Sequence, residues 1–171
     1  LEYLHGLSPP VVHRDFTPDN LILRSDGKLK LIDFNVAQQV EEKTTGTVVG
    51  KHAYLPPEQF RGETVSQSDL YALGATLFFL LAGVDPEPIS VSRPKDIVPT
   101  VSQGFSDIVA KATAIAEDER YQSAKEIEEA VAENPNNPLK NAPHTLTIRS
   151  TDAAGNVTTV VRKFQYNWVD P

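Results

Sequence analysis

The sequence predicts an α+β fold that is mostly helical, with a small β-hairpin, a long loop and a second β-hairpin at the C-terminal end. Three observations predict it. An apolar run at 70–82 ends in a helix-stop signal, two short β-rich runs flank Ser25–Gly27, and two alternating runs flank 152–156. The run 70–82 is too short for a membrane span, which needs about 20 apolar residues, so we expect a buried helix.

The composition is that of a globular protein. The chain has 171 residues, of which 40% are hydrophobic and 23% charged, enough for a domain with a real core. Its formal net charge of -7 disfavours nucleic acid and anionic membrane surfaces as partners. No cysteine is present, which excludes disulfides and thiolate chemistry. Because methionine is also absent, we expect the sequence to be a piece of a longer chain.

The N-terminal third contains the first hairpin. Residues 1–7 resemble the end of an amphipathic helix that stops near Gly6. The runs Asn20–Arg24 and Lys28–Ile32 form the predicted hairpin. Val36–Glu58 is polar and rich in threonine, and we expect a long functional loop there.

The middle of the chain predicts three helices. Ser66–Gly83 is the strongest, with its first residue as N-cap and its last as C-cap. Val84–Pro99 is proline-rich, and we expect it to be irregular. Ser102–Ile115 and Ser123–Glu133 are the other two helices.

The domain organisation follows from composition. Residues 1–133 form the first domain, and 134–143 form a linker rich in asparagine and proline. Residues 144–171 form a β-hairpin tail. TLTIRSTDAAGNVTT in this tail resembles the last hairpin of bacterial immunoglobulin-like repeats.

The chemistry concentrates in HRDFTPDN at His13–Asn20 and in Asp33, thirteen positions after Asn20. Two carboxylates and one amide then lie on short loops that flank a rigid hairpin, and such loops can converge. Few hard oxygen ligands suit Mg²⁺, which keeps phosphate oxygens in its shell. A third carboxylate beside the metal could accept a proton from a hydroxyl.

HRDFTPDN resembles the catalytic loop of protein kinases, and DFN at 33–35 resembles their D-F-G motif. The resemblance implies the C-terminal lobe of a eukaryotic-like serine/threonine kinase of bacterial, perhaps cyanobacterial, type. It implies that Asp15 is the catalytic base, and that Asn20 and Asp33 bind Mg²⁺ and the phosphates of ATP. It also implies that Arg14 reads a phosphorylated activation segment, while His13 is structural.

Further motifs match the same family. LPPE at 55–58 resembles its A-P-E motif, and DLYALG at 69–74 resembles the start of its buried central helix. The resemblance implies that Asp69 braces the catalytic loop and that Glu58 pairs with Arg120. It covers Leu1 to about Ala132.

Two site residues depart from the family pattern. Thr17 stands where these kinases carry a lysine that touches the transferring phosphate, and Lys51 stands where they carry its threonine partner. We therefore expect Lys51 to supply the cation, with Thr17 as its hydroxyl partner. The alternative is that Lys51 is simply solvated on a loop.

Other departures concern the nucleotide site. Asn35 replaces the glycine of D-F-G, and asparagine tolerates the positive φ that this turn needs. The chain has no Gly-rich phosphate loop and no V-A-I-K-type lysine. We therefore expect negligible kinase activity from these 171 residues alone.

The expected partners are a protein substrate and the N-terminal lobe of the same parent chain, with ATP and Mg²⁺ as cofactors. Thr44, Thr45 and Thr47 lie on the expected activation segment, where a phosphorylated threonine could pair with Arg14. The resemblance implies a cytoplasmic kinase lobe and leaves open whether the parent protein is membrane-associated.

Three other functions stay open. A non-catalytic pseudokinase or scaffold is favoured by Thr17 and disfavoured by the joint presence of Asp15, Asn20 and Asp33. A small-molecule phosphotransferase also uses an aspartate-x₄-asparagine loop, but the PPE motif argues against it. An adhesion module rests on the C-terminal tail alone.

Overall fold

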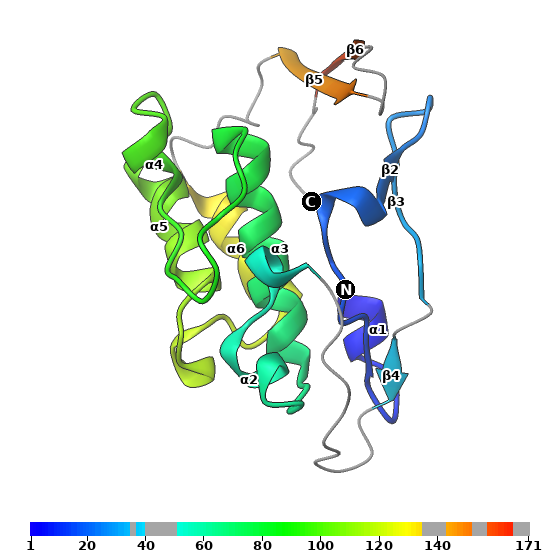
Figure 1. Cartoon of the computed structure of the whole chain (residues 1–171), viewed down its shortest axis with the longest axis vertical. Helices are drawn as coiled ribbons and strands as arrows, with labels where there is room; N and C mark the ends of the chain where they lie inside the picture. Colours follow the sequence, from blue (N-terminus) through cyan, green and yellow to red (C-terminus); the bar gives the residue numbers. More distant parts are fainter. Residues whose placement is uncertain (35–36, 40–50, 135–142, 152–156, 166–171) are drawn as a thin grey trace. The chain divides into compact units, whose positions relative to one another are not determined.

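The structure is a computed structural model, and it describes residues 1–34, 37–39, 51–134, 143–151 and 157–165. They belong to two compact units, Leu1–Asn134 and Pro135–Pro171 (Figure 1). The first unit is mainly helical with two small antiparallel sheets, and the second holds one hairpin. The predicted α+β class is therefore confirmed.

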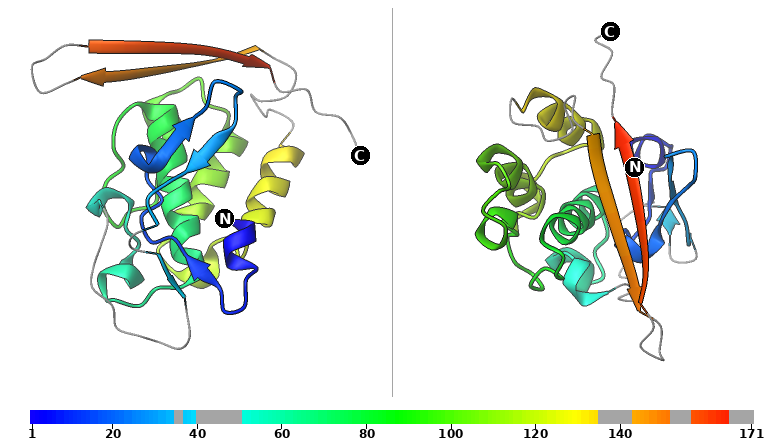
Figure 2. Two further views of the ribbon diagram at one scale, coloured as in Figure 1. Left: turned by 90° about the vertical axis from the view of Figure 1, so that its right-hand side faces the viewer. Right: turned by 90° about the horizontal axis from the view of Figure 1, so that it is seen from above.

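Helix α3 (Ser66–Ala82) is the centre of the first unit (Figures 1 and 2). It contacts α4 (Pro94–Ile97) and α5 (Gln103–Ala112) as well as the segment before the first hairpin. Its buried residues lie all around its axis, as expected for a helix inside a core. The helix ends at Gly83, whose φ of 72° is the left-handed conformation that glycine adopts readily.

The predicted cap at the start of α3 is wrong by one residue. Val65 is the N-cap and Ser66 is already helical. The hydroxyl of Ser68 accepts a hydrogen bond from the Val65 N–H at 3.2 Å. Two serines, Ser66 and Ser68, occur near this helix start, so composition alone could not select the one that bonds.

Helices α5 and α6 (Ala124–Glu133) begin at the serines that the sequence indicated. The Ser102 hydroxyl accepts from the Phe105 N–H, and the Ser123 hydroxyl accepts from the Glu126 N–H. The two helices share a core with α3, made by Leu70, Ile108, Ala112, Tyr121 and Ile127. Helix α5 ends three residues earlier than predicted, at Ala112 rather than Ile115.

The N-terminal part carries a short helix and two small sheets. Helix α1 spans Glu2–His5, and strand β1 (Val11–Val12) pairs antiparallel with β4 (Gln38–Gln39). Strands β2 (Leu21–Leu23) and β3 (Leu29–Leu31) form the predicted hairpin. This hairpin separates the HRDFTPDN loop from Asp33, so both loops start from one rigid element.

The predicted long loop contains short helical turns near its end. A 3-10 turn, η2, spans His52–Tyr54, and α2 spans Pro57–Phe60. Helix α4 likewise lies in the region predicted to be irregular. Each has only three or four residues, too few for a periodic pattern to appear in the sequence.

The second unit is an antiparallel hairpin of β5 (Pro143–Thr151) and β6 (Val157–Gln165). The alternating runs in the sequence predict shorter strands, Thr145–Arg149 and Val157–Phe164. The likeness of this hairpin to an immunoglobulin-like repeat stays a prediction. Among the residues that the structure describes, no helix has both the length and the apolarity needed to cross a membrane.

Candidate active site

The backbone of the HRDFTPDN loop is held by side chains of α3. The buried carboxylate of Asp69 accepts the N–H of His13 at 2.7 Å and the N–H of Arg14 at 2.8 Å. His5 Nε2 lies 2.9 Å from the same carboxylate. About two turns after Asp69 on α3, the Thr76 hydroxyl donates to the carbonyl of Phe16 at 3.2 Å. The loop is therefore anchored to the central helix of the first unit.

Arg14 adopts a φ of 71°, a conformation that is uncommon for residues other than glycine. The bond from its N–H to Asp69 and a second bond to its carbonyl hold it there. That second bond comes from Gln59 Nε2, at 2.6 Å. Gln59 is only 1% exposed, yet the sequence analysis missed it. Its partner is a backbone atom, so no motif marks it in the sequence.

His13 is fully buried and does not face other metal-ligating side chains. Its Nε2 lies 3.1 Å from the carbonyl of Ile32, and its ring meets the edge of the Phe34 ring at a centroid distance of 4.9 Å. His13 thereby connects the HRDFTPDN loop to the residues beside Asp33. This geometry is that of a packing histidine.

Asp15 and Asn20 form the centre of the candidate site. Asn20 Nδ2 donates to the Asp15 carbonyl and to Asp15 Oδ2, both at 2.8 Å. The other carboxylate oxygen, Oδ1, is buried and has no hydrogen-bond partner among the residues that the structure describes. A buried carboxylate oxygen without a donor is costly, and this is the type of atom that can receive a proton from a bound hydroxyl.

Lys51 and Thr17 border the same depression as Asp15. Thr17 is 2% exposed, and the Lys51 ammonium forms an ion pair with Asp19, which the sequence analysis did not single out. No hydrogen bond joins Thr17 to Lys51 in the part of the chain that the structure describes. The structure therefore brings Lys51 to the site but gives it a carboxylate partner instead of a hydroxyl.

Asp33 and Asn20 supply oxygens of the kind that Mg²⁺ prefers. Asp33 is exposed at the end of the first hairpin, with a φ of 61°. Both amide hydrogen bonds of Asn20 use its nitrogen, so its oxygen stays available as a ligand. No cluster of three or more His, Cys, Asp or Glu that could hold a metal ion occurs among the described residues. Asn35 lies outside the described residues.

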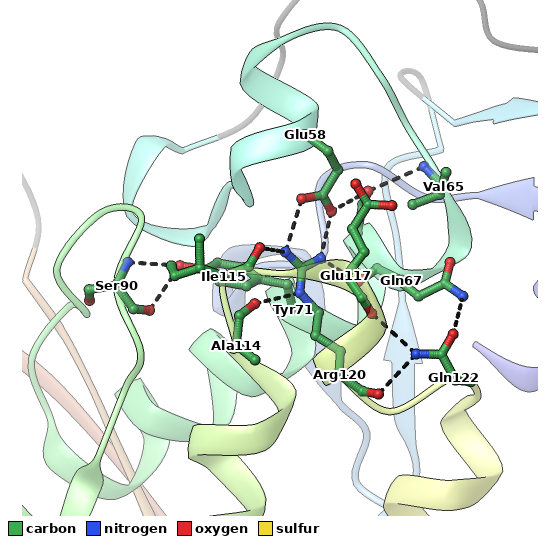
Figure 3. Close-up of polar contacts among 11 residues, drawn as sticks. Glu58, Val65, Gln67, Tyr71, Ser90, Ala114, Ile115, Glu117, Arg120 and Gln122 are labelled. Atoms are coloured by element: carbon green, nitrogen blue, oxygen red, sulfur yellow. Dashed lines mark hydrogen bonds and ion pairs between the residues drawn. The ribbon is translucent and has the colours of Figure 1, made fainter.

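Glu58 and Arg120 form a buried bidentate ion pair, with N–O distances of 2.6 and 2.9 Å (Figure 3). Their side chains are 2% and 0% exposed. The remaining donors and acceptors are also satisfied. Ser68 donates to Glu58, and Arg120 donates to the carbonyls of Ala114 and Ile115. The pair links α2 to the turn before α6, far from Asp15 in the sequence.

Tyr71 extends this network to the segment after α3 (Figure 3). The Arg120 guanidinium lies 5.0 Å from the centroid of the Tyr71 ring. The Tyr71 hydroxyl donates to the Ser90 carbonyl at 3.1 Å and accepts from the Ser90 N–H. Burial raises the pKa of Tyr71 above its usual value, so the hydroxyl stays protonated and continues to donate.

Thr44, Thr45 and Thr47 lie outside the described residues, so the predicted phosphorylation sites have no structural account. Arg14, their predicted partner, is buried with 9% of its surface exposed. Its proposed regulatory role stays a prediction.

The helical core around α3, the braced loop with Asp15 and Asn20, and the buried Glu58–Arg120 pair all lie in the first compact unit. Comparison with protein families matches the protein kinase domain over residues 1–145. The chain therefore belongs to the protein kinase family. This family implies ATP as the phosphoryl donor and typically a divalent metal ion.

Individual relatives point to the bacterial branch. The chain is 34% identical over 146 residues to the serine/threonine-protein kinase PknA of Nostoc sp., covering 77% of this chain and 26% of that protein. It is 32% identical over 171 residues to PknB of Mycobacterium tuberculosis, covering 86% and 27%. A probable serine/threonine-protein kinase of Clostridium perfringens is 33% identical over 134 residues, covering 68% and 20%. The predicted resemblance to bacterial eukaryotic-like kinases is confirmed, and the chain spans only 20–27% of these relatives.

Proposed function

We propose that this chain carries the phosphoryl-transfer residues of a protein serine/threonine kinase. In the parent protein, the γ-phosphoryl group of ATP would pass to a serine or threonine hydroxyl of a protein substrate. The observation that carries the proposal is the Asp15 carboxylate, which has one oxygen held by Asn20 and the other buried without a partner in the described part of the chain. The kinase names of the bacterial relatives support it.

Asp15 is the base in this proposal. Its Oδ1 accepts the proton of the substrate hydroxyl while the hydroxyl oxygen bonds to the γ-phosphorus. The bond between the γ-phosphorus and the bridging oxygen breaks, and ADP leaves with the electron pair. Asn20 keeps the carboxylate aimed during the step, because two hydrogen bonds fix their relative orientation.

Asn20 and Asp33 are the proposed ligands of Mg²⁺. The bound ion would neutralise charge on the phosphates. The Asn20 amide then has two tasks, because its nitrogen orients Asp15 and its oxygen would be a ligand of the metal. Replacing Asn20 by alanine should therefore weaken both metal binding and transfer.

Lys51 supplies the cation that the catalytic loop lacks at Thr17. It borders the Asp15 depression, and its flexible side chain can extend toward a phosphate. The 171 residues contain no Gly-rich loop, so we assign the remaining nucleotide contacts to an N-terminal lobe of the parent protein. We place this kinase lobe in the cytoplasm, where ATP is available.

A non-catalytic scaffold is the second candidate. One observation favours the scaffold. In the described part of the chain, no lysine or arginine bonds to Asp15. The parent protein, purified and incubated with Mg²⁺ and labelled ATP, distinguishes the two candidates. Label on serine or threonine that disappears in Asp15→Ala supports the kinase, and a folded protein without label supports the scaffold.

A further inference from the structure

One ion pair joins two segments of the site that are far apart in sequence. Lys51 Nζ contacts Asp19 Oδ2, and 32 positions separate the two residues. Asp19 lies in the 3-10 turn Pro18–Asn20, directly beside Asn20. Lys51 follows the undescribed segment 40–50 and caps the η2 turn. The pair therefore connects the loop that carries Asp15 to Lys51, the residue proposed to supply the cation for the phosphate.

The backbone of Lys51 is fixed independently of this pair. Its carbonyl accepts the N–H of Tyr54 at 2.9 Å. The Tyr54 hydroxyl donates to Asp85 at 2.5 Å, and burial followed by this hydrogen bond raises the pKa of Tyr54, so the donor remains protonated. The backbone of Lys51 is therefore fixed, and only its side chain can rotate toward different partners.

Two carboxylates of the same loop, Asp19 and Asp15, are the candidate partners of the Lys51 ammonium. Asp15 borders the depression that Lys51 also borders, and among the described residues its Oδ1 has no hydrogen-bond partner. An ammonium bonded to Asp15 Oδ1 would occupy the atom that has to receive the proton. In the structure the Lys51 ammonium forms its ion pair with Asp19 instead, so it does not occupy Asp15 Oδ1.

We infer that Asp19 is a positioning residue that keeps the Lys51 ammonium at the edge of the Asp15 depression and off the base. This inference rests on the proposed kinase function. The pair itself is exposed, with side chains 56% and 66% accessible, so it contributes little to folding stability. A structural role would therefore not explain a large effect of removing it.

The test uses the parent protein and steady-state phosphorylation of a serine peptide. Asp19→Asn removes the charge at constant size, and we expect kcat to fall about tenfold with KM for ATP nearly unchanged. Asp19→Glu should recover most of the rate, because it keeps the carboxylate. In a Lys51→Met background, Asp19→Asn should have no further effect, because there is no ammonium left to position.

A matched control separates this effect from the loss of any exposed ion pair. Asp107 pairs with Arg93 at 3.7 Å with similar exposure, away from the site, and Asp107→Asn should leave kcat unchanged. An unchanged kcat in Asp19→Asn, or an equal loss with and without Lys51, would overturn the inference while the kinase function stands. No transfer by the wild-type protein would overturn both.

A second readout does not depend on activity. The side-chain ammonium ¹⁵N resonance of Lys51, measured by NMR on the parent protein, should shift in Asp19→Asn and stay in place in Asp107→Asn. If the ¹⁵N chemical shift of the Lys51 ammonium does not change in Asp19→Asn, the ion pair is not formed in solution and the inference fails.

Discussion

At the scale of single residues, Asp15 and Glu58 show how one chemical group takes two roles. Both oxygens of Glu58 are bonded to Arg120, and the pair is closed off from solvent. Asp15 has one bonded oxygen and one that has no partner within the ranges that the structure describes. The satisfied carboxylate stabilises the fold, and the incompletely satisfied one is available for chemistry.

The Glu58–Arg120 pair gives the first prediction. Arg120→Met leaves a carboxylate buried without its cation, and we expect a loss of about 3–5 kcal/mol in the free energy of unfolding. Urea denaturation of the 171-residue chain measures it. Replacing both partners, as Glu58→Leu with Arg120→Met, should cost much less, since no charge remains buried.

A matched exposed pair provides the control for Arg120. Lys125 lies 3.8 Å from Glu129 on the surface of α6, and Lys125→Met should change the unfolding free energy by less than about 1 kcal/mol. Equal effects of Lys125→Met and Arg120→Met would contradict a structural role for the buried pair.

Glu117 gives a pH-dependent prediction. Burial, followed by the nearby charge of Glu58, raises the pKa of Glu117 above its ordinary value of 4.5. A raised carboxyl pKa in the folded state means that Glu117 favours folding only while it is protonated, at low pH. That contribution is lost as the pH rises through the folded-state pKa.

Glu117→Gln tests this by differential scanning calorimetry at two pH values. The variant should melt at a higher temperature than the wild type at pH 7, and the gap should shrink near pH 4. A melting temperature at pH 7 that is equal to or lower than that of the wild type would argue against the unfavourable charge at Glu117.

Residue roles at the site were only partly predictable from the sequence. The spacing of His13–Asn20 and Asp33 singled out Asp15 and Asn20, because a motif of eight residues carries that information. Gln59 and Asp19 were missed. Their bonds go to a backbone carbonyl and to a lysine 32 positions away, and such partners leave no local pattern.

At the scale of elements, α3 shows which features a sequence determines by itself. Its apolar run and Gly83 fixed the helix and its end, because both signals are local. The pairing of β1 with β4 was not predicted. Each strand has two residues, and 26 positions separate Val12 from Gln38, so only tertiary packing selects that partner.

Gly74 in the interior of α3 gives an element-scale prediction. Alanine in a helix is normally about 1 kcal/mol more favourable than glycine. Here a methyl group would lie 2.7 Å from the Ala112 side chain and 2.9 Å from that of Thr113, where α5 ends. We therefore expect Gly74→Ala to destabilise the fold by about 1–3 kcal/mol, measured by urea denaturation.

Gly104 in α5 is the comparison for Gly74. A methyl group there would meet the side-chain amide of Asn134 at 3.0 Å, and a side chain can shift more easily than a helix. Gly104→Ala should therefore be milder than Gly74→Ala. If Gly74→Ala stabilised the protein, the close approach of α3 and α5 would be refuted.

At the scale of the whole molecule, the chain holds the proposed base and the proposed metal ligands but no Gly-rich loop. It also spans 20–27% of its bacterial relatives. We expect the 171-residue chain alone to bind Mg·ATP weakly and to transfer no measurable phosphate, whereas the parent protein transfers it. Side-by-side assays at equal concentration test this, and activity of the short chain at the rate of the parent would contradict it.

The most direct test of the central claim is the single-turnover rate of phosphoryl transfer by the parent protein with Asp15→Asn. Asparagine keeps the size of the side chain but cannot accept the hydroxyl proton, so the rate should fall by about a hundredfold or more, with Mg·ATP binding retained. Asp107→Asn, a remote exposed aspartate, should keep the full rate. A wild-type rate in Asp15→Asn would contradict the assignment of Asp15 as the base.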